Sequence, residues 1–132
     1  MTKNVLVIAN SLEEQVHLLL LLTAGEFTPT CCACLPSALS ALESETFDAI
    51  LTEPIIQDAP PQKITAVEFI SLVRKDARNT TTPIVVMGDV FSFEYIMNTL
   101  RSGIARFIPK PFTSTELLET ISAEISLSKN ND

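Results

Sequence analysis

Short apolar runs alternate with amphipathic stretches along the whole chain, and each pattern occurs five times. The runs are rich in β-branched residues and almost continuously apolar, which is typical of strands buried on both faces of a parallel sheet. We predict strands at residues 5–9, 30–33, 49–52, 84–87 and 105–108. Because a helix follows each strand, we expect right-handed crossovers and a doubly wound three-layer α/β sandwich. The natural solution for five parallel strands is the flavodoxin-like order 2-1-3-4-5.

Local signals predict where the helices begin and end. Residues 11–14 and 113–116 fit the Ser/Thr-x-x-Glu capping box that opens a helix. Gly25 suits the end of the first helix, because glycine adopts positive φ without strain. Pro36 suits the first turn of the second helix. We therefore expect helices at about residues 11–25, 36–44, 66–76 and 92–102, and from residue 113 onward.

Composition and charge exclude several classes of function. The 132 residues fit one domain, which we place at residues 1–127 with a polar tail at 128–132. The net charge of -7 would repel a phosphate backbone, so we do not expect nucleic-acid binding. The longest apolar run, Leu18–Leu22, is far shorter than the roughly 20 residues needed to cross a bilayer, and no signal peptide is visible. We expect a cytoplasmic protein without a membrane role.

Cysteine and histidine offer little material for a metal or redox site. Cys31, Cys32 and Cys34 would alternate faces on a strand, so their thiols cannot converge on one tetrahedral metal. We interpret them as small buried hydrophobic residues, with a redox or zinc role as the alternative. His17 stands alone on the first helix and is not expected to bind a metal.

The predicted architecture places function at the carboxyl ends of the strands, near the switch point between the first and third strands. The side chains expected at this edge of the sheet are Ala9, Asn10, Glu53, Pro54, Gly88, Asp89 and Lys110. The sequence contains no glycine-rich phosphate loop and no nucleophile elbow. The chemistry of the protein is therefore expected to come from these residues.

Four segments carry a more specific pattern: residues 5–10 (VLVIAN), 47–54 (FDAILTEP), 83–87 (PIVVM) and 103–111 (GIARFIPKP). With these segments the chain resembles the receiver domain of two-component response regulators over nearly its whole length. The Lys-Pro of the last segment is the most specific feature. In that family two acidic residues after the first strand hold Mg²⁺, an Asp after the third accepts phosphate, the fourth ends in Thr or Ser, and the fifth ends in Lys.

The resemblance implies a degenerate phosphoacceptor pocket in this chain. Ala9 and Asn10 occupy the positions of the acidic pair, Glu53 that of the phosphoacceptor, and Gly88 that of the hydroxyl residue; only Lys110 is retained. Phosphoryl transfer needs a metal that neutralises charge, so we expect Mg²⁺ binding to be lost and no other cofactor to be needed. We therefore expect a pseudo-receiver that is not an enzyme and acts as a protein-interaction module in signalling.

Two alternatives remain open at this pocket. A small ligand or an anion near Lys110 would make the domain a sensor. A non-standard carboxylate, Glu53 or Asp89, would make it an active phosphoacceptor, with Asp89 or Asp58 as the source of a carboxylate for a metal. We expect an ion pair between Glu53 and Lys110, because opposite charges within about 4 to 6 Å favour both charged forms. The resemblance also implies a cis peptide bond between Lys110 and Pro111.

Three further features bear on partners. Phe107 occupies the switch-aromatic position of the family, and we expect it to pack inward because Gly88 leaves space. The proline-rich segment 54–65 is longer than its counterpart in receivers and is either a docking loop or an insertion without a role. The leucines at 18–22 extend past one apolar stripe, so some face outward. They form either a wider core or a partner surface, homodimeric or with another domain.

Overall fold

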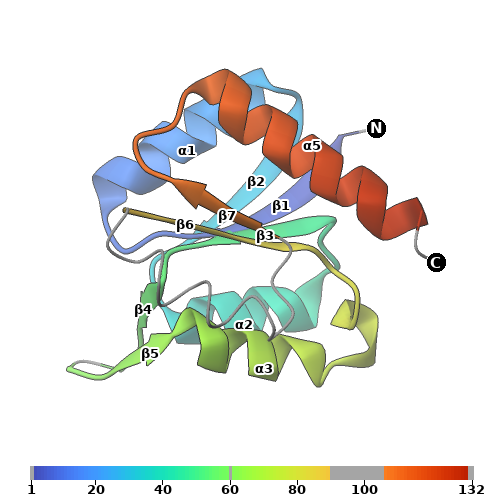
Figure 1. The fold of residues 1–132 in the computed structure, drawn as a ribbon. Coiled ribbons are helices and arrows are strands. Elements are labelled where there is room, and N and C mark those ends of the chain that lie inside the picture. The colour runs from blue at the N-terminus through green and yellow to red at the C-terminus, as the bar shows by residue number, and fades with distance from the viewer. Residues whose placement is uncertain (1, 60, 90–105, 131–132) are drawn as a thin grey trace.

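A computed structural model describes residues 2–59, 61–89 and 106–130. Its centre is a parallel five-stranded sheet with the order β2-β1-β3-β6-β7 (Figure 1). The strands are β1 (Lys3–Ile8), β2 (Phe27–Cys32), β3 (Ala49–Thr52), β6 (Ile84–Gly88) and β7 (Arg106–Pro109). Counted within this sheet alone, the order is 2-1-3-4-5, so the predicted fold class is confirmed.

Helices cover both faces of the sheet and complete the three layers. The helices α1 (Leu12–Ala24) and α5 (Ser114–Asn130) lie on one face, and α2 (Leu35–Ser44) and α3 (Ala66–Arg74) on the other (Figure 1). A short 3-10 helix, η1 (Ala77–Asn79), follows α3. The helix expected at residues 92–102 lies outside the described residues.

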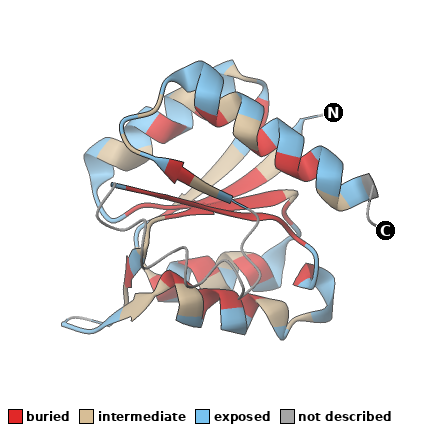
Figure 2. Cartoon of the chain, in the orientation of Figure 1, coloured by how far each residue is buried: buried red, intermediate tan, exposed pale blue. Residues whose placement is uncertain are grey.

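Alternation along the central strand explains why the sheet is buried on both sides. Val5 and Val7 of β1 point into the cluster formed with α1 and α5, whereas Leu6 and Ile8 point into the cluster formed with α2 and α3. Figure 2 shows buried residues concentrated in the central strands and on the inward faces of the helices. Each fully buried side chain of this size contributes about 1.5 to 3 kcal/mol, so the two clusters fix the sandwich.

Hydroxyl caps open α1, α3 and α5, whereas α2 begins without a side-chain cap. Ser11 Oγ accepts the N–H of Glu14 at 3.1 Å, and Thr113 Oγ1 accepts the N–H of Glu116 at 3.1 Å. The helix α3 has a complete capping box between Thr65 and Glu68, which the sequence analysis did not identify. At the other end of the chain, α5 continues to Asn130. Residues 128–130 are therefore helical, whereas we expected a polar tail from residue 128.

The end of α1 differs from our expectation. The helix ends at Ala24, and Gly25 has a φ of -85°, while the positive φ of 69° falls on Glu26. A Cβ at Gly25 would collide with the side chain of Leu118 on α5. Glycine therefore gives room to the Leu118 side chain of α5, which would have to shift if a Cβ were added, and it is not needed for a left-handed backbone.

The proline-rich segment 54–65 contains a β-hairpin, which the sequence analysis did not predict. The strand β4 (Ile55–Gln57) pairs antiparallel with β5 (Lys63–Thr65), and the N–H of Asp58 donates to the carbonyl of Gln62 at 2.9 Å. Ile56 is fully buried in the α2/α3 cluster, and Ile64 packs against the same cluster. These two isoleucines anchor the hairpin to the domain.

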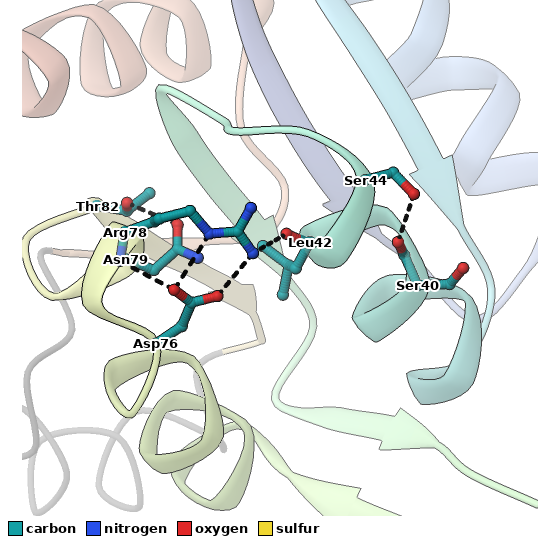
Figure 3. A network of polar contacts seen from close by, with 7 residues as sticks. All are labelled: Ser40, Leu42, Ser44, Asp76, Arg78, Asn79 and Thr82. Atoms are coloured by element: carbon teal, nitrogen blue, oxygen red, sulfur yellow. Dashed lines mark hydrogen bonds and ion pairs between the residues drawn. The ribbon is translucent and has the colours of Figure 1, made fainter.

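A polar network joins the loops at the amino edge of the sheet (Figure 3). The guanidinium of Arg78 pairs with Asp76 at 2.9 Å and donates to the carbonyl of Leu42 at 2.9 Å. The hydroxyl of Thr82 donates to Oδ1 of Asn79 at 3.0 Å. These contacts connect the end of α2 to the segment that leads into β6. Within the described part of the chain, no helix has the length and apolar character needed to span a membrane.

Candidate functional site

A hollow of about 250 Å³ lies at the carboxyl edge of the sheet, between the ends of β1, β3, β6 and β7. It contains most of the residues expected at this edge, together with one residue of the hairpin. Its lining consists of Asn10, Glu53, Pro54, Ile55, Gly88, Asp89 and Lys110. Ala9 is fully buried beneath it and is not part of the lining. The predicted edge residues are thus brought together, and Ile55 is added by the hairpin.

Backbone hydrogen bonds beyond the strands hold the two charged residues of the hollow. The N–H of Glu53 donates to the carbonyl of Ile8 at 3.2 Å, which extends the β1–β3 pairing by one step. The N–H of Lys110 donates to the carbonyl of Gly88 at 2.7 Å. The peptide bond between Lys110 and Pro111 is cis, as expected. Both side chains are therefore fixed close to the ends of buried strands.

The ammonium group of Lys110 contacts two carboxyl groups. Its Nζ lies 3.6 Å from Oε1 of Glu53, so the ion pair predicted from the sequence is present. The same Nζ lies 2.5 Å from Oε1 of Glu14, a residue in the first turn of α1. The side chains of Lys110, Glu14 and Glu53 are 29%, 24% and 17% exposed. Two half-buried acids therefore share one base at this edge.

Glu14 is the functional residue that the sequence analysis missed. The capping-box pattern accounts for its backbone, because its N–H donates to Ser11 Oγ, but its carboxylate contacts Lys110. The available signal was position: Glu14 lies in the first turn of the helix that follows directly on Ala9 and Asn10, the residues expected at this edge. The first turn of α1 thus returns an acidic side chain to the edge of the sheet.

The shared lysine gives the two glutamates opposite protonation behaviour. Burial raises the pKa of Glu53 to about 7, and the hydrogen bond with Glu14 adds to this shift, while Lys110 offsets part of it. Burial also acts upward on Glu14, but the hydrogen bond with Glu53 and the contact with Lys110 hold the pKa of Glu14 below its usual value. Lys110 favours the charged form of Glu53, as expected, but burial first and Glu14 second outweigh it, so the net shift of the Glu53 pKa is upward.

Comparison with known proteins concerns the fold. No protein-family model matches the sequence, and no curated protein matches it. The structure is similar to the chemotaxis response regulator CheY4 of Vibrio cholerae, with a TM-score of 0.82, 22% identity, and coverage of 94% of this chain and 99% of that chain. A response regulator receiver domain protein from Clostridium thermocellum gives a TM-score of 0.86 at 14% identity, covering 98% of this chain and 99% of that one. The chain has the receiver fold.

A longer protein also contains a part similar to this chain. NtrX from Brucella abortus matches with a TM-score of 0.88 and 17% identity, over 99% of this chain and 28% of that chain. The receiver fold therefore occurs both alone and within longer proteins among these structures.

The residues present do not fit the Mg²⁺ ion that the resemblance to receivers implies. Ala9 carries no donor atom, and Nδ2 of Asn10 donates to the carbonyl of Ile55 at 2.9 Å. The positive charge of Lys110 already lies against Glu53.

Within residues 2–59, 61–89 and 106–130, no three His, Cys, Asp or Glu side chains are placed to hold a metal ion. Asp89 lines the hollow, and Asp58 lies in the hairpin outside its lining. Loss of Mg²⁺ binding remains a prediction.

The other parts of the receiver pocket are also altered. Gly88 ends β6 without a hydroxyl group. Phe107 is half-buried and packs inward against the α2/α3 cluster, as expected, and its neighbour in the sheet is Val86. Among the cysteines only Cys32 is fully buried, and Cys34 lies at the start of α2 instead of within β2. Burial raises the pKa of the Cys31 and Cys32 thiols, which disfavours the reactive thiolate.

The outward face of α1 is apolar. Leu12 is 74% exposed and Leu20 is 65% exposed, and Val16 lies between them at the same helical spacing. Leu18 and Leu22 are fully buried in the α1/α5 cluster. The leucine run therefore serves both the core and the surface, and the expected outward leucines are present.

Proposed function

We propose that this domain is a pseudo-receiver: a cytoplasmic protein-interaction module of two-component-type signalling that does not accept a phosphoryl group and is not an enzyme. The observation that carries the proposal is the contact of Lys110 with both Glu14 and Glu53. In phosphoryl transfer, cations must neutralise the charge on the phosphoryl oxygens. Here Lys110, the one cation among the described residues that line the hollow, is already shared by two acids.

The metal ligands, the hydroxyl group and the nucleophile that this chain lacks or has altered all act in phosphoryl transfer, which supports the proposal. No carboxylate is present at Ala9 or Asn10 to hold a metal, and Gly88 supplies no hydroxyl. The carboxyl group of Glu53 lies 3.6 Å from the ammonium group of Lys110, so a phosphate donor would meet a carboxyl group that is already paired. Groups that act as one catalytic unit lose most of their activity when a single member is removed.

The sensor alternative has less support. The hollow of about 250 Å³ is smaller than the roughly 300 to 1,000 Å³ of ordinary small-molecule sites. An anion would also have to displace carboxylates from Lys110, whose Nζ lies 2.5 Å from Glu14. The phosphoacceptor alternative depends on Asp89, because this acid lines the hollow.

Acetyl phosphate tests the proposal. The full chain is incubated with acetyl phosphate and Mg²⁺, and its intact mass is measured. We expect no change, and no Mg²⁺-dependent rise in melting temperature. A gain of about 80 Da, the mass of one phosphoryl group, would contradict the proposal. The Asp89→Asn variant is the matched control, because it reports whether any label depends on that acid.

A further inference from the structure

Glu14, Glu53 and Lys110 come from different elements and meet at one point. Glu53 follows β3 and immediately precedes the hairpin, Glu14 lies in the first turn of α1, and Lys110 follows β7. Two carboxyl groups and one ammonium group are neutral together only when one carboxyl group carries a proton. The cluster is half-buried, so water screens an imbalance of charge only in part.

We propose that a proton shared by Glu14 and Glu53 is a latch that holds the first turn of α1 against the start of the β4–β5 hairpin. The proposal concerns regulation of the site described above, and it rests on the proposed function in taking that site to be occupied by these acids and not by a phosphoryl group.

In the latched state, the protonated carboxyl group of Glu53 donates to the carboxylate of Glu14, and Lys110 pairs with Glu14 at 2.5 Å. When the proton leaves, the hydrogen bond between the two acids is lost. Two carboxylates then face each other across a single ammonium group, and like charges at this separation repel. The contact between α1 and Glu53 changes from attraction to repulsion.

The backbone transmits this change to the hairpin. Glu53 is joined through Pro54 to Ile55, which is 41% exposed at the mouth of the hollow. Asn10, next to the cap of α1, donates to the carbonyl of Ile55 at 2.9 Å. The shared proton and the Asn10 side-chain amide thus form two neighbouring hydrogen bonds that connect the start of α1 to the start of the hairpin. Loss of the proton leaves this amide hydrogen bond and the bridge through Lys110, without the direct hydrogen bond between the two acids.

The surrounding charges favour a transition near neutral pH. On α1, Glu13 and His17 flank Glu14, and the charge of His17 favours the ionised form of Glu14. Beyond β6, Asp89 is the other acid lining the hollow, and Lys110 is the base. The hairpin contributes no charged residue to this lining. The pKa of Glu53, about 7, agrees with one proton being held by the pair below neutral pH.

Nuclear magnetic resonance of the full chain between about pH 5 and about pH 9 tests the latch, because this range spans neutral pH. The side-chain carboxyl carbon of Glu53 and the backbone amides of Ser11 and Ile55 are followed. We expect all three signals to share a midpoint near pH 7. In Glu14→Gln the midpoint should fall by about one pH unit or more, because the neighbouring negative charge is removed.

Two variants control this experiment. Glu13→Gln removes an adjacent acid outside the contacts of Lys110 and should leave the midpoint unchanged. His17→Asn removes the imidazole that lies near Glu14 on α1, and the amide transitions should persist. The latch is overturned if Glu53 titrates near 4.5, the ordinary value for a glutamate, if Glu14→Gln does not move its midpoint, or if the amide transitions vanish in His17→Asn.

This result is separable from the test of the proposed function. Phosphoryl labelling of the wild type with a Glu53 midpoint near 7 would remove the proposed function and keep the proton-sharing pair. A Glu53 midpoint near 4.5 without labelling would remove the latch and keep the proposed function.

Discussion

The two edges of the sheet use charge differently. At the amino edge, the Arg78 guanidinium meets the Asp76 carboxylate and a backbone carbonyl, and Arg74 donates to the carbonyls of Asn79 and Thr82 at 2.8 Å and 2.7 Å. At the carboxyl edge, Lys110 is shared by two acids. The first arrangement satisfies each charge without a titrating proton. In the proposed latch the second depends on one, so we expect the carboxyl edge to be the end of the domain that responds to pH.

The protonation chemistry of the two bases sharpens this contrast. A guanidinium stays protonated throughout the pH range in which proteins are folded, so the contacts of Arg74 keep their strength. Hydrogen bonds to charged groups contribute about 1.5 to 3 kcal/mol each. The contacts of Lys110 change their balance whenever Glu53 gains or loses a proton. The contribution of the amino edge to the free energy of unfolding should therefore be independent of pH. The contribution of the carboxyl edge should change with pH.

Arg74→Met should have the largest effect. Two carbonyl groups lose their charged donor, so we expect a loss of about 3 kcal/mol in the free energy of unfolding. The loss should be the same at about pH 5.5 and about pH 8, as measured by urea denaturation. Lys75→Met, at the exposed neighbouring position, should change stability by less than about 0.5 kcal/mol. If the loss of stability in Arg74→Met varied with pH, the contrast between a pH-independent amino edge and a pH-dependent carboxyl edge would be wrong.

The pH dependence of the wild type should come next in size. Because the pKa of Glu53 is raised from 4.5 to about 7, the native chain binds more protons than the unfolded chain between these values. Stability should therefore fall as pH rises through this window, by on the order of 2 kcal/mol, and level off above it. Glu53→Gln should remove most of this slope, and Glu13→Gln should retain it. An equal slope in the wild type and Glu53→Gln would show that another group is responsible.

Lys110→Met should give a smaller loss that grows with pH. Without the ammonium group, ionised Glu53 faces Glu14 with no compensation. We expect about 1 kcal/mol of destabilisation at about pH 8 and less at about pH 5.5, in the same denaturation experiment. Lys63→Met on the exposed surface of the hairpin is the matched control. Equal losses for Lys110→Met at both pH values would mean that the lysine has a packing role only.

Leu20→Ser should have the smallest effect on folding, within about 0.5 kcal/mol, because this side chain is 65% exposed. Its effect should appear in sedimentation, where we expect the wild type to form a dimer at high micromolar concentration and the variant to remain a monomer. Burying exposed leucine stabilises an interface by about 25 cal/mol per Å². A monomeric wild type would exclude the homodimer and leave a heterotypic partner on α1.

The sequence was most informative where periodicity and strand order determine position. The apolar runs predicted the sheet, and the order of its strands placed Glu53 and Lys110 at one edge. Glu14 was missed because its local capping signal explained the same residue without reference to a distant lysine. The hairpin was missed because its strands are short and their burial comes from tertiary contacts of Ile56 and Ile64. The protonation of Glu53 depends on contacts between the ends of β3 and β7 and the start of α1. No local sequence pattern contains this information.

The most direct measurement is intact mass after acetyl phosphate treatment of restored variants. Glu53→Asp alone should remain unlabelled, because Ala9 and Asn10 still provide no anionic ligand for a metal. Combining it with Ala9→Asp, Asn10→Asp and Gly88→Thr should produce Mg²⁺-dependent labelling. Labelling of the single variant would contradict the central claim, since the metal ligands would then have to come from another acid, such as Asp89 or Asp58.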